Sequence, residues 1–187
     1  MDWKKWFSKG KKKGPDPIRD ICLSKMEVGW FVDYDLKTWE VTGRHHYDWG
    51  EGDLTYEWQL RSADDLIYLE METDDETFWS ISRKVPLARI DAGIGDHILA
   101  HGDPPEEITV EGETFYLDES GGGHFHKRDD GNGDTEGKPF LKWDYINEAE
   151  DRQISIEQWG EKAFEASMGE QVEEYQFTNI LPIEEPS

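Results

Sequence analysis

The stretch LIYLEME, residues 66–72, decides the fold class of this chain. Its apolar residues Ile67, Leu69 and Met71 alternate with a tyrosine and two glutamates. Successive side chains of a β-strand point to opposite faces, so this alternation is typical of a strand with one apolar and one polar face.

Similar segments, rich in aromatic or β-branched residues and bounded by Gly or Asp clusters, predict further strands. They cover residues 28–34, 38–47, 55–61, 78–85, 108–110, 114–117, 123–126, 140–146, 153–159, 163–166 and 172–177. Residues 86–106 are less regular and are interpreted as a crossover connection. The body contains no continuous amphipathic helix of ten residues, so strand should dominate over helix.

The two halves of the body resemble each other in the order of their aromatic strands. We therefore predict a mainly β, antiparallel fold of two similar β-meanders, forming a sandwich or a partly closed barrel. A basic aromatic tail and linker should cover residues 1–20, and a single β domain residues 21–187, with approximate halves 26–90 and 107–182. The alternative is chance, because alternating β-sequences often look alike.

Charge is divided unevenly along the chain. The formal net charge is −23, yet residues 1–13 carry six lysines and one aspartate, so the tail is +5 and the remainder −28. Aromatic residues make up 13% of the chain, with nine Trp, which argues against disorder. A single cysteine, Cys22, fits a reducing compartment. No apolar run is long enough to span a membrane, so we expect a cytoplasmic protein.

The tail has the pattern of an interfacial helix, with aromatic side chains on one face and lysines on the other. The candidate contact residues are Trp3, Lys4, Lys5, Trp6, Phe7, Lys9, Lys11, Lys12 and Lys13. They predict contact with an anionic membrane surface or a protein partner. A solvated tail, or one docked on its own acidic body, is the alternative. Nucleic acid is not expected, since the body repels phosphate.

Two further constellations suggest ligands. His124 and His126, at i and i+2 on one face of a strand, suit two metal-binding imidazoles, although surface histidines are the simpler reading. An acidic cluster beside an aromatic side chain could hold an organic cation, although a solvating face is the simpler reading. That cluster comprises Glu70, Glu72, Asp74, Asp75, Glu76 and Trp79. No residues stand out as catalytic, and no cofactor is expected.

An ordered set of motifs carries a family resemblance. It includes Trp39-Glu40-Val41-Thr42-Gly43, Tyr56-Glu57-Trp58-Gln59-Leu60, Trp143-Asp144-Tyr145, Ile154-Ser155-Ile156-Glu157 and Gly169. In this order the chain resembles the bacterial domain-of-unknown-function 4178 family over about residues 26–182. Members often lie beside genes for polyamine synthesis and membrane stress, so the resemblance implies an envelope-associated accessory role. It carries no catalytic residues with it.

Three functions follow as hypotheses. The first is a non-enzymatic accessory or adaptor module, cytoplasmic and recruited to the inner membrane face in an envelope-stress or polyamine-linked context. The second is a protein that binds polyamines or other cations through the acidic-aromatic surface. The third, with less support, is a metal-dependent enzyme that uses His124 and His126. Fold alone does not decide between them.

Overall fold

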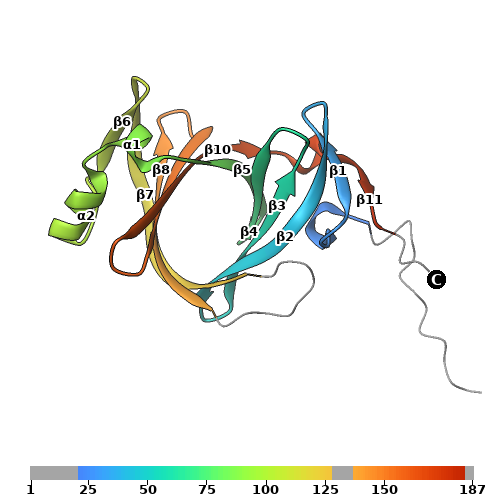
Figure 1. Ribbon diagram of the computed structural model, residues 1–187, viewed down its shortest axis with the longest axis horizontal. Helices are drawn as coiled ribbons and strands as arrows, with labels where there is room; N and C mark the ends of the chain where they lie inside the picture. Colours follow the sequence, from blue (N-terminus) through green and yellow to red (C-terminus); the bar gives the residue numbers. More distant parts are fainter. Residues whose placement is uncertain (1–20, 128–136, 184–187) are drawn as a thin grey trace, which may run out of the picture.

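The computed structural model describes residues 21–127 and 137–183. These residues form an 11-stranded antiparallel sheet in the order β11-β1-β2-β3-β4-β5-β10-β9-β8-β7-β6, with a further pairing between β2 and β7 (Figure 1). The strong curvature of this sheet brings its middle strands around into a ring.

Two five-strand meanders build the sheet. The first consists of β1 (Phe31–Tyr34), β2 (Lys37–Gly50), β3 (Asp53–Arg61), β4 (Leu66–Thr73) and β5 (Thr77–Val85). The second consists of β6 (Glu107–Val110), β7 (Glu113–His126), β8 (Lys138–Asn147), β9 (Arg152–Trp159) and β10 (Ala163–Val172). Short elements surround them: η2 (Leu23–Lys25), α1 (Leu87–Ile90), α2 (Ile94–His101), η3 (Glu174–Gln176) and β11 (Thr178–Leu181).

The predicted fold class is confirmed: the chain is mainly β, antiparallel and built from two similar meanders. Two strand predictions need correction. Residues 114–117 and 123–126 belong to one continuous strand, β7, which passes through the glycine run with a bulge near Leu117. The strand predicted at 172–177 is wrong, because a reciprocal capping box between Glu173 and Gln176 closes a 3-10 turn there.

Eight strands, β2-β3-β4-β5-β10-β9-β8-β7, form the ring, and the β2–β7 pairing closes it. That pairing covers three residue pairs, His46 with His126, Tyr47 with Phe125 and Asp48 with His124, so the barrel is only partly closed. The other contact between the meanders, β5 with β10, is longer. Each seam therefore joins equivalent strands of the two meanders.

Glycine permits close backbone approach at both seams. A Cβ on Gly123 of β7 would lie 2.1 Å from the carbonyl oxygen of Asp48 on β2. A Cβ on Gly169 of β10 would lie 2.6 Å from the carbonyl oxygen of Ile81 on β5. Both separations are shorter than any van der Waals contact, so a side chain at either position would push the seam apart.

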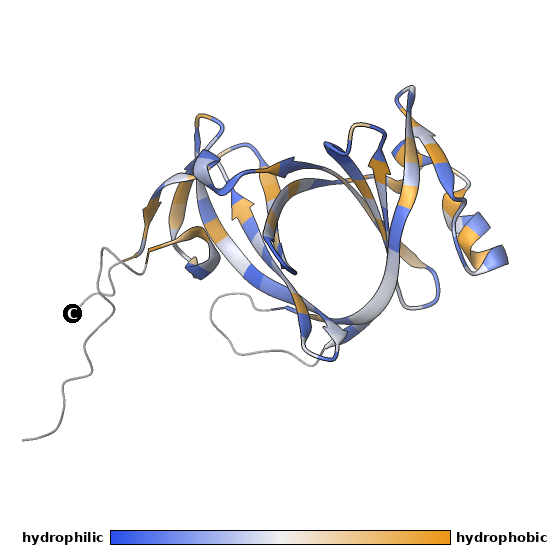
Figure 2. Cartoon of the chain, turned by 180° about the vertical axis from the view of Figure 1, so that it is seen from behind, coloured by the Kyte–Doolittle hydropathy of each residue, from blue (hydrophilic) through white to orange (hydrophobic). Residues whose placement is uncertain are grey.

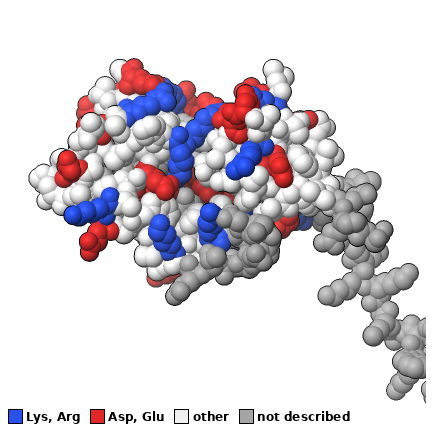
Figure 3. All heavy atoms as spheres, viewed as in Figure 1, with Lys and Arg blue, Asp and Glu red and all other residues white. Residues whose placement is uncertain are grey.

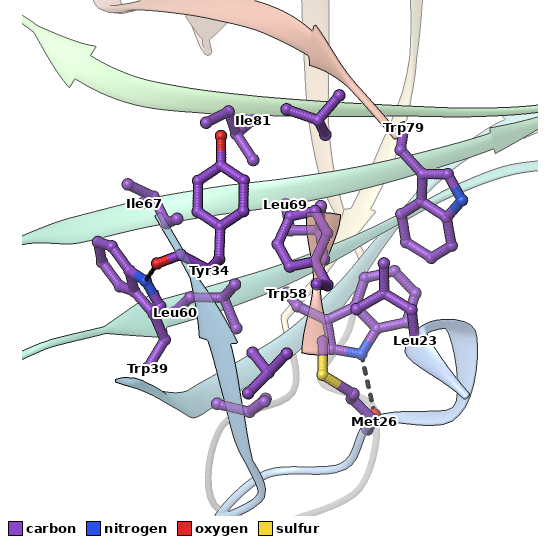
Figure 4. Close-up of a cluster of buried hydrophobic side chains, with 14 residues drawn as sticks. Leu23, Met26, Tyr34, Trp39, Trp58, Leu60, Ile67, Leu69, Trp79 and Ile81 are labelled. Atoms are coloured by element: carbon purple, nitrogen blue, oxygen red, sulfur yellow. Dashed lines mark hydrogen bonds between the residues drawn. The ribbon is translucent and has the colours of Figure 1, made fainter. Parts of the chain in front are cut away.

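The first hydrophobic core lies between strands β2–β5 and the segment that contains η2, β1 and β11. Trp58 is fully buried here, and its indole Nε1 donates a hydrogen bond of 2.9 Å to the Met26 carbonyl oxygen (Figure 4). Ile67 and Leu69, the apolar residues of the opening stretch, pack beside it. This core holds the outer strand pair against the ring.

The second hydrophobic core lies on the opposite flank of the ring. Trp143 and Tyr145 of β8 pack with Ile154 and Ile156 of β9. Isoleucines of α1 and α2 cover them, so the connection between the two meanders shields this core from solvent. Hydrophobic and hydrophilic residues accordingly alternate along the strands of the ring (Figure 2). The polar faces of these strands line the inside of the ring.

Candidate functional site

Charged side chains meet across the middle of the ring. Glu57, Lys142 and Glu157 come from β3, β8 and β9 and expose only 3%, 4% and 2% of their surface. Burial of a charge is unfavourable unless the charge is paired and hydrogen-bonded. The partners of these groups therefore define the site.

Tyr47 contacts two glutamates, and Lys84 contacts one of them. The Tyr47 hydroxyl donates a hydrogen bond of 2.7 Å to Glu157 and a longer one of 3.4 Å to Glu57. The Lys84 ammonium lies 2.6 Å from the other oxygen of Glu157. Because Tyr47 is on β2 and Glu157 is on β9, this contact spans the interior of the ring.

Lys142 connects the opposite walls of the ring. Its ammonium lies 3.4 Å from Glu70 on β4, 3.4 Å from Asp144 on β8 and 5.3 Å from the centre of the Tyr47 ring. We call the group formed by Tyr47, Glu57, Glu70, Lys84, Lys142 and Glu157 the ionic waist.

Glu57 and Glu157 of the ionic waist have pKa values shifted in opposite directions. Burial, followed by the charge of Glu70, raises the pKa of Glu57 to about 8. Burial also acts to raise the pKa of Glu157, but Lys84 and Lys142 outweigh it and hold that pKa below its ordinary value. At neutral pH Glu57 is therefore mostly protonated and Glu157 is ionised.

The two lysines remain charged. Burial acts to lower the pKa of Lys142, but the charges of Asp144, Glu70 and Glu157 outweigh it and raise that pKa. Lys84 follows the same pattern through Glu157 and Glu57. Burial raises the pKa of the Tyr47 hydroxyl well above its ordinary value, so Tyr47 acts as a neutral donor.

An acidic chamber of about 460 Å³ opens on one side of the ionic waist. Eight carboxylates line it, against two cations and three aromatic side chains. The carboxylates are Asp53, Glu70, Glu72, Asp118, Glu119, Asp144, Glu150 and Asp151; the cations are Lys142 and Arg152; the aromatic residues are Trp49, Phe78 and Trp79. They come from seven strands, β2, β3, β4, β5, β7, β8 and β9, and from the β8–β9 turn.

A lysine chamber of about 500 Å³ opens on the other side. Its lining combines lysines with aromatic rings: His45, Tyr47, Glu57, Gln59, Tyr68, Lys84, Phe125, Lys127, Lys138, Trp159 and Glu165. The Lys138 ammonium lies 4.7 Å from the centre of the Trp159 ring. Acidic and basic side chains also meet near the centre of the face in Figure 3. The ring thus presents chambers of opposite character at its two ends.

The structure divides the predicted cation-binding cluster. Glu70 and Glu72 line the acidic chamber, whereas Asp74, Asp75 and Glu76 lie at the β4–β5 turn outside its lining. Trp79 reaches the chamber but is buried in the first hydrophobic core, and its neighbour Phe78 is the more exposed aromatic residue of the lining.

His124 and His126 lie on β7 at the β2–β7 seam. The His126 ring stacks on that of His46 with centroids 4.6 Å apart. Among residues 21–127 and 137–183, no group of three or more His, Cys, Asp or Glu side chains could hold a metal ion. The described residues therefore supply no third ligand to this pair.

The tail residues, from Trp3 to Lys13, lie outside the described residues. Within the described residues no helix is both long and apolar enough to cross a membrane. Sequence reasoning missed Lys84, Lys142 and Glu157. The available signal was parity: Lys142 shares the face of Phe140 and Asp144, opposite Trp143 and Tyr145 of the second core.

Fold and site together define a partly closed antiparallel β-barrel with a charged interior. The chain belongs to the family described as "Domain of unknown function (DUF4178)", whose profile matches residues 27–174. It is similar to an uncharacterized protein of Aquifex aeolicus, with 29% identity over 179 residues that cover 96% of each chain. No solved structure matches it.

Proposed function

We propose that this domain is a non-enzymatic binding module that takes an elongated organic polycation, of the polyamine class, into the acidic chamber. The observation that carries the proposal is the excess of eight carboxylates over two cations in one lined cavity. Both of those cations are engaged already, Lys142 with Glu70 and Arg152 with Glu113. A strongly negative field remains for a ligand.

The chain contains its own example of ammonium binding. Lys142 presents a primary ammonium to two carboxylates and to the face of an aromatic ring. Trp49 and Phe78 offer the same combination of ring and carboxylate within the chamber. An alkylammonium is attracted to both groups, by charge and by the negative face of the ring.

The spread of the carboxylates favours an extended ligand over a metal ion. A calcium ion needs six to eight oxygens converging at about 2.3–2.6 Å, and the described residues contain no such grouping. Burial, followed by the charge of Glu119, raises the pKa of Glu72, and the charge of Lys142 offsets this only in part. The positive charges spaced along a polyamine would neutralise carboxylates at several points in the chamber. An eight-stranded barrel is also wide enough for one small ligand.

The proposal can be tested by thermal unfolding with spermidine and with NaCl at equal ionic strength. Spermidine should raise the melting temperature more, because specific binding adds to screening. Glu72→Gln combined with Glu119→Gln should remove this excess. Asp74→Asn combined with Glu76→Gln is the matched control, since it removes two charges at the nearby turn but none from the chamber. Equal loss in both variants would reduce the effect to general screening.

Recruitment by the tail, which the sequence favours for an adaptor, stays a separate proposal because it rests on residues outside the described part. Binding to anionic vesicles should require both lysines and aromatic residues. Trp3→Ala with Trp6→Ala should abolish co-sedimentation at physiological salt. If deletion of residues 1–14 leaves co-sedimentation unchanged, the tail is not an anchor.

A further inference from the structure

We propose that uptake of a polycation by the acidic chamber releases a proton from Glu57 into the lysine chamber, an inference that rests on the proposed function. Glu57 lines the lysine chamber and Glu70 lines the acidic chamber, so the two carboxyl groups face opposite ends of the ring. Both carboxyl groups belong to the ionic waist, so a change of charge in the acidic chamber would alter the protonation of a group in the lysine chamber.

The first step in the argument is the position of Glu57 and Glu70. They are directly paired across strands β3 and β4, and both side chains point into the ring. Two like charges in such a cross-strand pair repel each other, and burial strengthens the repulsion. One of the two carboxyl groups therefore tends to hold a proton.

The second step is the allocation of the two ammonium groups. Lys142 contacts Glu70 and Asp144, and Lys84 contacts Glu157 and Glu165. Within residues 21–127 and 137–183, neither lysine comes within 4.0 Å of Glu57. The hydrogen bond that Glu57 accepts from the Tyr47 hydroxyl is long, at 3.4 Å. Glu57 is thus the carboxyl that keeps the proton, in agreement with its raised pKa.

The charged and titratable groups around Glu57 come from six strands of the ring. They are His45 and Tyr47 of β2, Tyr68 and Glu70 of β4, Lys84 of β5, Lys142 of β8, Glu157 of β9 and Glu165 of β10. Among these charges, Glu70 does most to keep Glu57 protonated, and it lines the acidic chamber, where a ligand can reach it.

The third step is the effect of the ligand. An ammonium group bound beside Glu70 offsets its negative charge, so the repulsion that keeps Glu57 protonated falls. The proton then leaves the carboxyl oxygen of Glu57 for solvent in the lysine chamber, and the negative charge stays on Glu57 near Lys84 and Lys142. By linkage, a rise in pH must strengthen binding of the polycation to the same extent.

Calorimetric titration of the full chain with spermidine at pH 7, in PIPES and in Tris buffers of different ionisation enthalpy, counts the protons released. With a pKa of about 8, Glu57 is roughly nine-tenths protonated at this pH. Wild type should release on the order of half to one proton per spermidine, and affinity should rise roughly three- to tenfold per pH unit between pH 6.5 and 7.5.

Glu57→Gln should still bind spermidine but release at least half a proton less, with a flatter pH dependence. Glu165→Gln, a carboxyl of the same chamber that contacts Lys84, is the matched control and should release as many protons as wild type. If Glu57→Gln does not fold, Glu70→Gln takes its place and should also show reduced release. Saturable binding with equal release in wild type and Glu57→Gln overturns the coupling alone. Absence of saturable heat in wild type overturns the proposed function and, with it, the coupling.

Discussion

The two faces of the ring strands differ sharply. On β4, Ile67 and Leu69 point outward into the first hydrophobic core, while Glu70 and Glu72 point inward to the acidic chamber. Most small barrels fill the interior with apolar side chains; here the apolar cores lie on the two flanks and the interior is ionic. The fold is thus stabilised from outside, which leaves the inside available for a ligand.

This division has a physical basis in the extra elements. The strands β1, β6 and β11 and the helices α1 and α2 cover the outer faces and remove them from water. With the burial of apolar area provided there, at about 25 cal/mol per Å², the ring interior can tolerate buried charges. The following predictions test this division of roles, in order of decreasing effect.

Trp58→Ala should cause the largest loss of stability. The substitution empties the centre of the first hydrophobic core and removes the hydrogen bond to the Met26 carbonyl. We expect a loss of about 3–5 kcal/mol, the range typical of a large buried aromatic residue, measured by urea unfolding. Leu36→Ala, at a fully exposed turn position, is the control and should change little. A loss below about 1 kcal/mol for Trp58→Ala would contradict the outer-core account.

Glu57→Gln should make stability less dependent on pH. The pKa of Glu57 is raised in the folded state, so its contribution is fully present below the unfolded value of 4.5 and is lost as pH rises through about 8. The variant should match wild type near pH 5 and exceed it at pH 9. One pKa unit corresponds to about 1.4 kcal/mol, and rearrangement of the neighbouring lysines reduces the total, so we expect a gain on the order of 3 kcal/mol.

The measurement for Glu57→Gln is urea unfolding at pH 5, 7 and 9. Glu107→Gln, on the exposed face of β6, is the control and should follow wild type at every pH. A constant difference between Glu57→Gln and wild type across this range would show that Glu57 does not titrate as its position indicates.

Much of the sheet was predictable from local pattern, but the ring was not. Alternation in residues 66–72 correctly predicted a two-faced strand, and repeated aromatic segments predicted two meanders. The same alternation does not reveal which face lies inside, because a polar face is ordinarily the solvent face. Closure depends on pairing β2 with β7, which are far apart in sequence, and the sequence predicted β7 as two separate strands, 114–117 and 123–126.

The candidate site was found only in part for the same reason. Glu70 and Glu72 were selected because they are close in sequence to other acids and to Trp79. Asp118, Glu119 and Asp144 join them only after the ring closes. Lys142 within a strand resembles an ordinary surface lysine, and its partner Glu70 lies 72 residues away.

Gly123→Ala should weaken the seam between β2 and β7. The added methyl group would lie 2.1 Å from the Asp48 carbonyl oxygen, so the strands must separate. Overpacking of this kind costs about 1–3 kcal/mol, and amide exchange should become faster along β2 and β7 before it does in the outer cores. Gly93→Ala is the control, since its nearest neighbour would be 3.4 Å away. Unchanged exchange at the seam would show that the ring closes without this contact.

The smallest effect should come from an ion pair on the outer face of β5. Arg83 and Lys84 are consecutive, so they point to opposite faces: Arg83 pairs with Asp65 at 3.0 Å outside, and Lys84 pairs with Glu157 at 2.6 Å inside. Arg83 is about half exposed, and exposed pairs contribute only about 0.2–1 kcal/mol. Glu157 is buried, so removal of Lys84 leaves its charge less compensated in a site with little water; breaking a buried pair typically costs about 3–5 kcal/mol.

Double-mutant cycles with Arg83→Met and Asp65→Asn, and with Lys84→Met and Glu157→Gln, measure the two couplings by urea unfolding. We expect a coupling below about 1 kcal/mol for the outer pair and at least about 2 kcal/mol for the inner pair. Added salt should weaken the outer coupling more, since water and ions reach it freely. Because the two cations are adjacent on one strand, backbone position and strand stability are nearly the same for both. Equal couplings with equal salt dependence would mean that water enters the ring, and that its interior is no different electrostatically from the surface.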